Sequence, residues 1–97
     1  MATIEIIREH SFSLEEARVR TRRVIDEMQK KRPELFGDVQ WSENGSYAEA
    51  KGKGFSAVIE VGRSEASIEV DLNLMLKPFK KKLETKINDK FDEVFDE

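Results

Sequence analysis

The chain has 97 residues, a length typical of one domain, and we predict a single domain over residues 1–97 with a modest hydrophobic core. The net charge is -3, so general electrostatic attraction to nucleic acid is not expected. The chain contains no cysteine, which excludes disulfide bonds, thiolate catalysis and cysteine-ligated metal sites.

The first ten residues do not have the pattern of a signal peptide, because charged residues interrupt the apolar ones. No other stretch is long and apolar enough to cross a membrane. We therefore expect a cytoplasmic, bacterial-type protein without a membrane span.

Residues 3–9 place Ile4 and Ile6 on one face, and this alternation predicts a first strand.

A helix is predicted from Ser13 to about Lys31. Ser13 and Glu16 have the spacing of a capping box, in which each side chain satisfies a free backbone N–H of the first turn. Pro33 ends the helix because proline has no N–H to donate and clashes with the preceding turn. The apolar face of this helix is formed by Leu14, Ala17, Thr21, Val24, Ile25 and Met28.

Four further strands are predicted, and tight turns join them into an antiparallel meander. The Asn44-Gly45 pair is a strong hairpin signal, because both residues tolerate positive φ. The return strand after this pair alternates poorly, so we expect a weak or edge strand there. The four strands cover residues 39–42, 46–51, 55–61 and 66–77.

The last predicted strand passes directly into the last predicted helix. Residues 66–76 alternate over their whole length. Pro78 favours extended geometry before it and a helical first turn after it. We therefore expect the strand to persist to about Lys77 and the helix to begin at about Pro78.

The apolar residues of the last helix are spaced by four, so their stripe rotates by roughly 40° at each step. Phe91 and Phe95 consequently turn away from Phe79. This drift indicates a helix that crosses the sheet diagonally, or one whose last turn faces a different partner from its first. Part of the stripe is then expected to lie exposed near the end of the helix. The stripe consists of Phe79, Leu83, Ile87, Phe91, Val94 and Phe95.

Together these elements predict an α+β fold with two layers. The element order is strand, helix, four strands, helix, and the five strands form a meander-type antiparallel sheet. Both helices have one apolar side, so both are expected to pack on the same face of the sheet. The order is similar to a reduced helix-grip arrangement, in which a curved sheet wraps a long C-terminal helix.

No group of residues has the pattern of a catalytic, cofactor-binding or metal-binding site. The single histidine, His10, lies at a strand–helix junction beside serines that are better explained as helix caps. One histidine without cysteine leaves only scattered carboxylates as metal ligands. The Gly52-Lys53-Gly54 segment is too short for a phosphate-binding loop. We predict that the protein is not an enzyme.

Two basic clusters have both an ordinary and a functional interpretation. The arginines of the first helix are mostly four residues from a carboxylate, which predicts ion pairs on a solvated face. Lysines gather instead at the start of the last helix, where the macrodipole disfavours cations and free N–H groups favour an anion. The ordinary alternative is that their stems cover apolar surface. These lysines are Lys77, Lys80, Lys81 and Lys82, and the carboxylates at the helix end are Asp89, Asp92, Glu93, Asp96 and Glu97.

Four parts of the sequence together resemble one known family: residues 10–18, Trp41, residues 59–62 and residues 74–80. The family is that of putative polyhydroxyalkanoic acid system proteins, which are small bacterial proteins, and the likeness covers nearly the whole chain. The junction at residues 74–80 is its most specific part. The resemblance implies an association with polyhydroxyalkanoate storage granules or their gene clusters, and it brings no established activity or catalytic residues.

We therefore predict a non-catalytic accessory protein of polyhydroxyalkanoate storage, without cofactor. Its expected partner is a granule surface, a granule protein or a second copy of the chain. Contact would be made through apolar surface near the end of the last helix, or through a groove between helix and sheet. The candidate apolar contacts are Phe79, Phe91 and Phe95, and the candidate anion contacts are Lys77, Lys80, Lys81 and Lys82.

Two alternatives remain open from the sequence. The first is a carrier of a small acyl-type ligand, with a cavity lined by Leu72, Leu74, Phe79 and Leu83. The second is a regulatory nucleic-acid binder that uses the arginine-rich first helix, against which the acidic balance argues.

Overall fold

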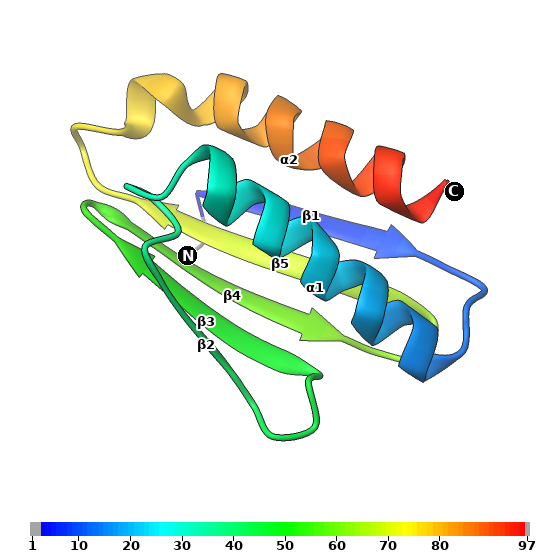
Figure 1. The fold of residues 1–97 in the computed structure, drawn as a ribbon. Helices are drawn as coiled ribbons and strands as arrows, with labels where there is room; N and C mark the ends of the chain where they lie inside the picture. The colour runs from blue at the N-terminus through cyan, green and yellow to red at the C-terminus, as the bar shows by residue number, and fades with distance from the viewer. Residues whose placement is uncertain (1–2, 97) are drawn as a thin grey trace.

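The computed structural model describes residues 3–96, and two helices lie on one face of a five-stranded sheet in it (Figure 1). Residues 1 and 2 of the predicted domain and the predicted acidic residue Glu97 lie outside the described residues. The predicted α+β class and element order are confirmed, whereas the helix-grip comparison stays a prediction. The elements are β1 (Ile4–Glu9), α1 (Leu14–Lys31), β2 (Asp38–Trp41), β3 (Tyr47–Gly52), β4 (Phe55–Val61), β5 (Glu65–Leu72), the 3₁₀ helix η1 (Lys77–Phe79) and α2 (Lys80–Phe95).

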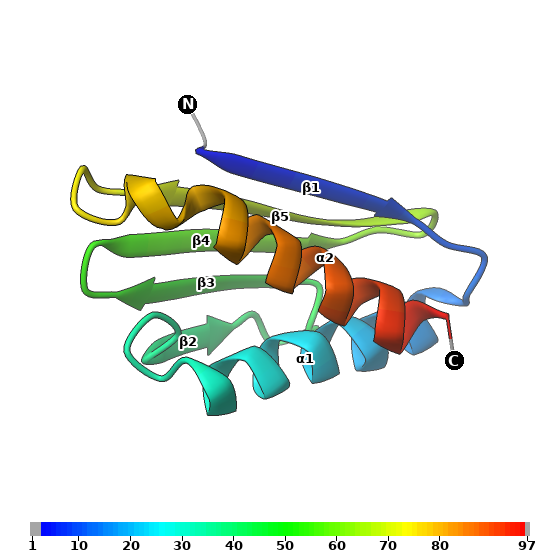
Figure 2. The ribbon, with the colours of Figure 1, turned by 90° about the horizontal axis from the view of Figure 1, so that it is seen from above.

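The sheet is antiparallel and its strands are ordered β1-β5-β4-β3-β2. Strands β2 to β5 form the predicted meander, and β1 adds to its far edge beside β5. Figure 2 shows α2 crossing the strands diagonally, and it shows α1 and α2 diverging towards the start of α2. The diagonal path agrees with the drift of the apolar stripe along the helix.

The two faces of the sheet differ in chemistry because side chains alternate along each strand. The face under the helices carries the core, whereas the bare face carries mostly carboxylates. Glu5 lies directly opposite Glu69 in the register of β1 and β5, a like-charge arrangement that costs stability. The Tyr47 phenol donates a hydrogen bond of 2.9 Å to Glu49, which raises the pKa of Tyr47.

Helix α1 begins as predicted, with Ser13 as its N-cap. The hydroxyl of Ser13 accepts a hydrogen bond of 3.1 Å from the backbone N–H of Glu16. The Glu16 carboxylate pairs with Arg20, so the structure records one half of the predicted capping box. Five of the six predicted apolar positions are buried: Ala17, Thr21, Val24, Ile25 and Met28.

The core contains one large side chain that lies outside any periodic element. Phe36, from the loop between α1 and β2, is fully buried and packs against Phe55 with the ring centroids 4.7 Å apart. This burial is not predictable from the sequence, because a single aromatic residue in a loop belongs to no periodic pattern that would indicate its partner. This loop is therefore anchored on the sheet rather than free at the surface.

The expectation of a weak or edge strand at residues 46–51 is wrong. Strand β3 lies between β2 and β4 and pairs with both along its length. Its inward residues Ala48 and Ala50 are fully buried, and their small side chains leave room for the helix layer above the sheet. Because alanine is only weakly hydrophobic, the alternation of buried and exposed residues in β3 has low contrast in the sequence. The edge strand on this side of the sheet is β2.

The expectation that β5 persists to about Lys77 is also wrong, because the strand ends at Leu72. Its neighbour β4 begins at this level, because Leu72 pairs with Phe55, the first residue of β4. A strand beyond Leu72 would therefore have no partner on the β4 side. The helical turn begins at Lys77, close to the predicted change of structure at Pro78.

Candidate functional site

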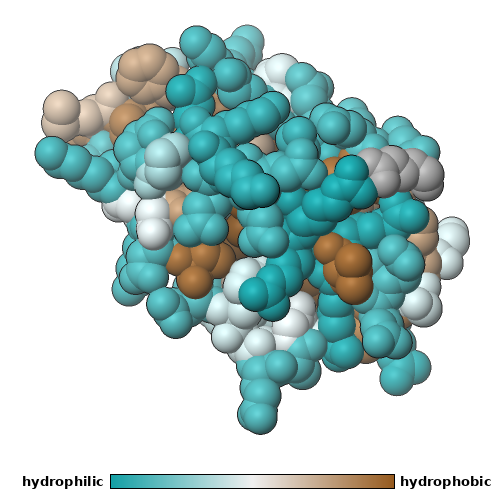
Figure 3. All heavy atoms as spheres, in the orientation of Figure 1, coloured by the Kyte–Doolittle hydropathy of each residue, from teal (hydrophilic) through white to brown (hydrophobic). Residues whose placement is uncertain are grey.

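The connection between β5 and α2 forms an exposed surface that is both apolar and basic; we call residues 73–82 the tip. Leu74 and Met75 are each 81% exposed, and Phe79 is 56% exposed. Figure 3 shows apolar atoms at the upper left of the molecule, where Figure 1 places this connection. Exposed apolar side chains that gather in one place mark contact sites, whereas isolated ones are ordinary.

A tight turn holds the apolar side chains of the tip outward. The side-chain oxygen of Asn73 accepts a hydrogen bond of 3.1 Å from the backbone N–H of Leu76. Its backbone oxygen accepts further bonds of 3.1 Å from Leu76 and Lys77. Asparagine favours turns because its side chain competes with strand pairing for backbone groups. The turn therefore fixes Leu74 and Met75 at the surface.

Four lysines lie close to these apolar side chains in the chain, and all four are exposed. They are Lys77, Lys80, Lys81 and Lys82. Within residues 3–96 none of them forms an ion pair, and no side chain caps the first turn of α2. Cations and free N–H groups therefore stand together at the start of this helix, where an anion would be favoured.

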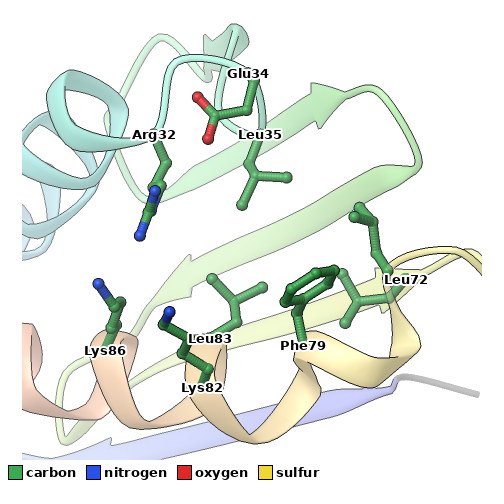
Figure 4. Close-up of a pocket in the computed structure, with 9 residues that line it drawn as sticks. Arg32, Glu34, Leu35, Leu72, Phe79, Lys82, Leu83 and Lys86 are labelled. Atoms are coloured by element: carbon green, nitrogen blue, oxygen red, sulfur yellow. The ribbon is translucent and has the colours of Figure 1, made fainter.

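A groove of about 260 Å³ opens beside the tip, between the start of α2 and the loop that follows α1 (Figure 4). Leu72, Phe79 and Leu83 line it, as the carrier alternative required, whereas Leu74 is largely exposed and does not line it. The groove is open to solvent and lies beside the core rather than within it. Its complete lining is Arg32, Glu34, Leu35, Leu72, Leu76, Phe79, Lys82, Leu83 and Lys86.

The prediction of exposed apolar surface near the end of the last helix is wrong. Phe91 is fully buried and Phe95 is only 8% exposed. The ring of Phe95 makes edge-on contacts with Phe12 at 5.7 Å and His10 at 6.1 Å between centroids. The far end of the stripe thus packs against the β1–α1 connection, a different partner from that of its first turn. Of the three candidate apolar contacts, Phe79 alone is exposed.

His10 makes two hydrogen bonds at the edge of the molecule. Its Nδ1 accepts from the backbone N–H of Phe12 at 3.2 Å, and its Nε2 lies 3.0 Å from the backbone oxygen of Gly62. Since one nitrogen accepts and the other faces an acceptor, the ring fits as the neutral tautomer that carries its proton on Nε2. The side chain thus ties the β1–α1 connection to the β4–β5 turn.

The arginines of α1 contact other parts of the same chain. Arg20 bonds the backbone oxygen of Val94 at 2.6 Å, and Arg18 bonds Ser46 at 2.7 Å. The guanidinium of Arg22 lies 5.3 Å from the centre of the Trp41 ring. Two of the predicted ion pairs are present, Glu16–Arg20 and Arg23–Glu27. These contacts explain the arginines without a nucleic-acid partner.

One buried charge was missed by the sequence reasoning. Lys90 of α2 is 6% exposed, and its ammonium lies 3.1 Å from both Glu27 of α1 and Glu93. Hydrogen bonds to these carboxylates raise the pKa of Lys90, and the bond from Lys90 lowers the pKa of Glu27. The available signal was spacing: Lys90 lies three residues after Ile87, on the apolar side of the helix.

Residues 3–96 contain no group of three or more histidine, cysteine or acidic side chains that could hold a metal ion. Neither helix in this range has the length and hydrophobicity needed to cross a membrane.

Comparison with known proteins identifies a family. The sequence model of a family described as putative polyhydroxyalkanoic acid system proteins matches residues 4–95, which is nearly the whole chain. No curated protein and no solved structure matches the chain.

Proposed function

The chain belongs to the family of putative polyhydroxyalkanoic acid system proteins, and on this premise we propose that it is a non-catalytic accessory protein that binds the granule surface through its tip. The proposal keeps the predicted partner and moves the contact from the end of α2 to its start. The candidate contacts are the apolar Leu74, Met75 and Phe79, with Lys77, Lys80, Lys81 and Lys82 around them.

The observation that carries the proposal is the 81% exposure of both Leu74 and Met75 in a turn held by Asn73. Burying a side chain of this size stabilises a complex by roughly 1.5–3 kcal/mol relative to leaving it in water. Two such side chains on a fixed turn provide an apolar anchor for a polyester or lipid-coated surface. The same two residues contribute nothing to the core.

The lysines add an electrostatic term to this anchor. A cation near an anionic surface contributes on the order of 1 kcal/mol, and the contribution falls within a Debye length. Binding of the tip to a surface that carries phosphate or carboxylate groups should therefore weaken as salt is raised. Exchange of Lys80, Lys81 and Lys82 for glutamine should weaken it as well.

Co-sedimentation with purified polyhydroxyalkanoate granules tests the proposal. We expect the double variant Leu74→Ser/Met75→Ser to lose most of the binding seen for the unchanged chain. The matched control is Ile7→Ser/Val19→Ser, which removes two other exposed apolar side chains, 54% and 61% exposed. Equal binding by the two double variants would refute the role of the tip, and no binding by the unchanged chain would refute the granule partner.

A further inference from the structure

The groove beside the tip is apolar along most of its length. Leu35 comes from the loop after α1, Leu72 from the end of β5, and Leu83 from the second turn of α2. Leu72 and Leu83 are each 6% exposed and line its inner part, whereas the other apolar lining residues, Leu76 and Phe79, belong to the tip itself. An apolar groove whose wall comes from three separate elements suits a flexible hydrocarbon chain.

One end of the groove is cationic. Figure 4 shows the side chains of Arg32 and Lys86 pointing towards each other across it, with Lys82 beside them. Among residues 3–96 none of these three side chains forms an ion pair. Glu34 is the one carboxylate that lines the groove, so cations outnumber it by three to one. The cationic end therefore suits a carboxylate.

The wall opposite α2 is held in place by close contact with the sheet. A side-chain carbon at Gly52 would lie only 2.1 Å from the backbone oxygen of Leu35, so the loop rests directly on β3. The backbone N–H of Lys53 also donates to the backbone oxygen of Glu34 at 3.4 Å. Phe36, the residue after Leu35, is fully buried and holds the loop on the sheet. A groove whose walls are fixed in advance loses little entropy when it binds a ligand.

From this arrangement we infer that the groove binds a single medium-length acyl chain that ends in a carboxylate. The chain lies along the leucines and Phe79, and the carboxylate lies between Arg32, Lys82 and Lys86. The volume of about 260 Å³ is just below the range of roughly 300–1,000 Å³ found for drug-sized ligands, so a long fatty acid is disfavoured. That the acyl chain is a hydroxyalkanoate, as a free acid or as the carboxyl end of the polyester, rests on the proposed function.

Titration of the isotope-labelled chain by NMR tests the inference with three probes. Octanoate has both a tail and a charged head, octan-1-ol has the tail with a neutral head, and acetate has the head alone. We expect octanoate to shift the methyl signals of Leu35, Leu76 and Leu83, with octan-1-ol bound at least about tenfold more weakly, since charge-assisted hydrogen bonds are the stronger ones. No shift with octanoate, or equal affinity for octan-1-ol, would overturn the inference.

Three variants locate the ligand. Lys86→Glu should weaken octanoate binding by about tenfold or more, whereas Lys51→Glu, the same change on the bare face of the sheet, should leave it unaltered. Leu76→Trp should fill the groove and abolish binding of octanoate and octan-1-ol alike. Unchanged octanoate affinity in Lys86→Glu or Leu76→Trp would place the ligand elsewhere and refute the groove.

The roles proposed for the tip and for the groove can be refuted independently of each other. The variant Leu74→Ser/Met75→Ser should still bind octanoate, because neither residue lines the groove. Granule binding by the unchanged chain without octanoate binding would refute the groove alone. Octanoate binding without granule binding would refute the proposed function and leave the groove as a site for anionic acyl chains. 3-Hydroxyoctanoate should bind at least as tightly as octanoate. Weaker binding of 3-hydroxyoctanoate would refute a hydroxyalkanoate as the ligand.

Discussion

The aromatic residues at the start and at the end of α2 belong to one repeat, but those at the end are buried and the one at the start is exposed. Phe91 and Phe95 are buried against the core and the β1–α1 connection, whereas Phe79 is 56% exposed beside Leu74 and Met75. The spacing by four is the same throughout. A repeat along a helix therefore identifies which side is apolar, and the neighbouring elements decide whether that side is covered.

The charges at the two ends differ in the same way. Both ends oppose the macrodipole, with lysines at the start of α2 and carboxylates at its end. At the end, Asp92 pairs with Arg8, Glu93 pairs with Lys90, and Arg20 bonds the backbone oxygen of Val94. The lysines of the first turns have no such partners in the described part of the chain. The fold compensates one end internally and leaves the other available to an anion.

The test with the largest expected effect replaces one phenylalanine at each end of α2 by alanine. Phe91→Ala should lower the free energy of unfolding by about 3–5 kcal/mol, because it leaves a cavity in the core. Phe79→Ala should cost less than about 1 kcal/mol, because that ring is largely in water. Urea unfolding followed by circular dichroism measures both. Similar losses would mean that the two ends are packed alike.

A lysine at each end gives the next largest contrast. Lys90→Ala should cost about 1.5–3 kcal/mol, because it removes buried hydrogen bonds to two carboxylates, whereas Lys81→Ala should change stability by no more than about 0.5 kcal/mol. A smaller effect of Lys90→Ala than of Lys81→Ala in urea unfolding would contradict the buried pair.

The contribution of Lys90 to the free energy of unfolding should also depend on pH. The pKa of Glu27 is lowered from its ordinary 4.5, so its contribution is present above about pH 4.5 and is lost as the pH falls through the folded value. The pKa of Lys90 is raised from 10.5, so its contribution is present below about pH 10.5 and is lost as the pH rises beyond the folded value. The difference in unfolding free energy between the unchanged chain and Lys90→Ala should shrink in acid. A difference that stays constant down to pH 2 would refute this linkage.

The smallest expected effect is a gain in stability. Lys81→Glu replaces a cation by an anion at the helix start and should stabilise the fold by about 0.3–1 kcal/mol at low salt, while it weakens granule binding. The gain should disappear at high salt because screening removes it. Lys51→Glu is the control, since it adds a carboxylate to the acidic face and should give no gain. A loss of stability in Lys81→Glu would mean that the lysine has a structural role.

The sequence was sufficient to predict the helices, the strands and the two layers. Alternating apolar residues indicate strands, and apolar residues spaced by about four indicate helices. The sequence was insufficient wherever a neighbour decides the outcome. The end of β5 at Leu72 depends on where β4 begins, and the burial of Phe36 depends on the ring of Phe55. The interior position of β3 was hidden by its small alanines.

The candidate site was predicted in part for the same reason. The lysines and Phe79 were identified because they are adjacent in the chain, and the exposure expected for Phe91 and Phe95 was wrong because their partners lie in the β1–α1 connection. The groove brings Arg32 together with Lys86 from the opposite helix, a meeting that no local pattern records.

Gly52 has a consequence that reaches beyond its own strand. Because a methyl group there would collide with the backbone of Leu35, even alanine at this position would act as a wedge beneath the loop. The wedge would reposition one wall of the groove without altering any residue that lines it. The width of the groove thus depends on the absence of a side chain at Gly52, on a neighbouring strand.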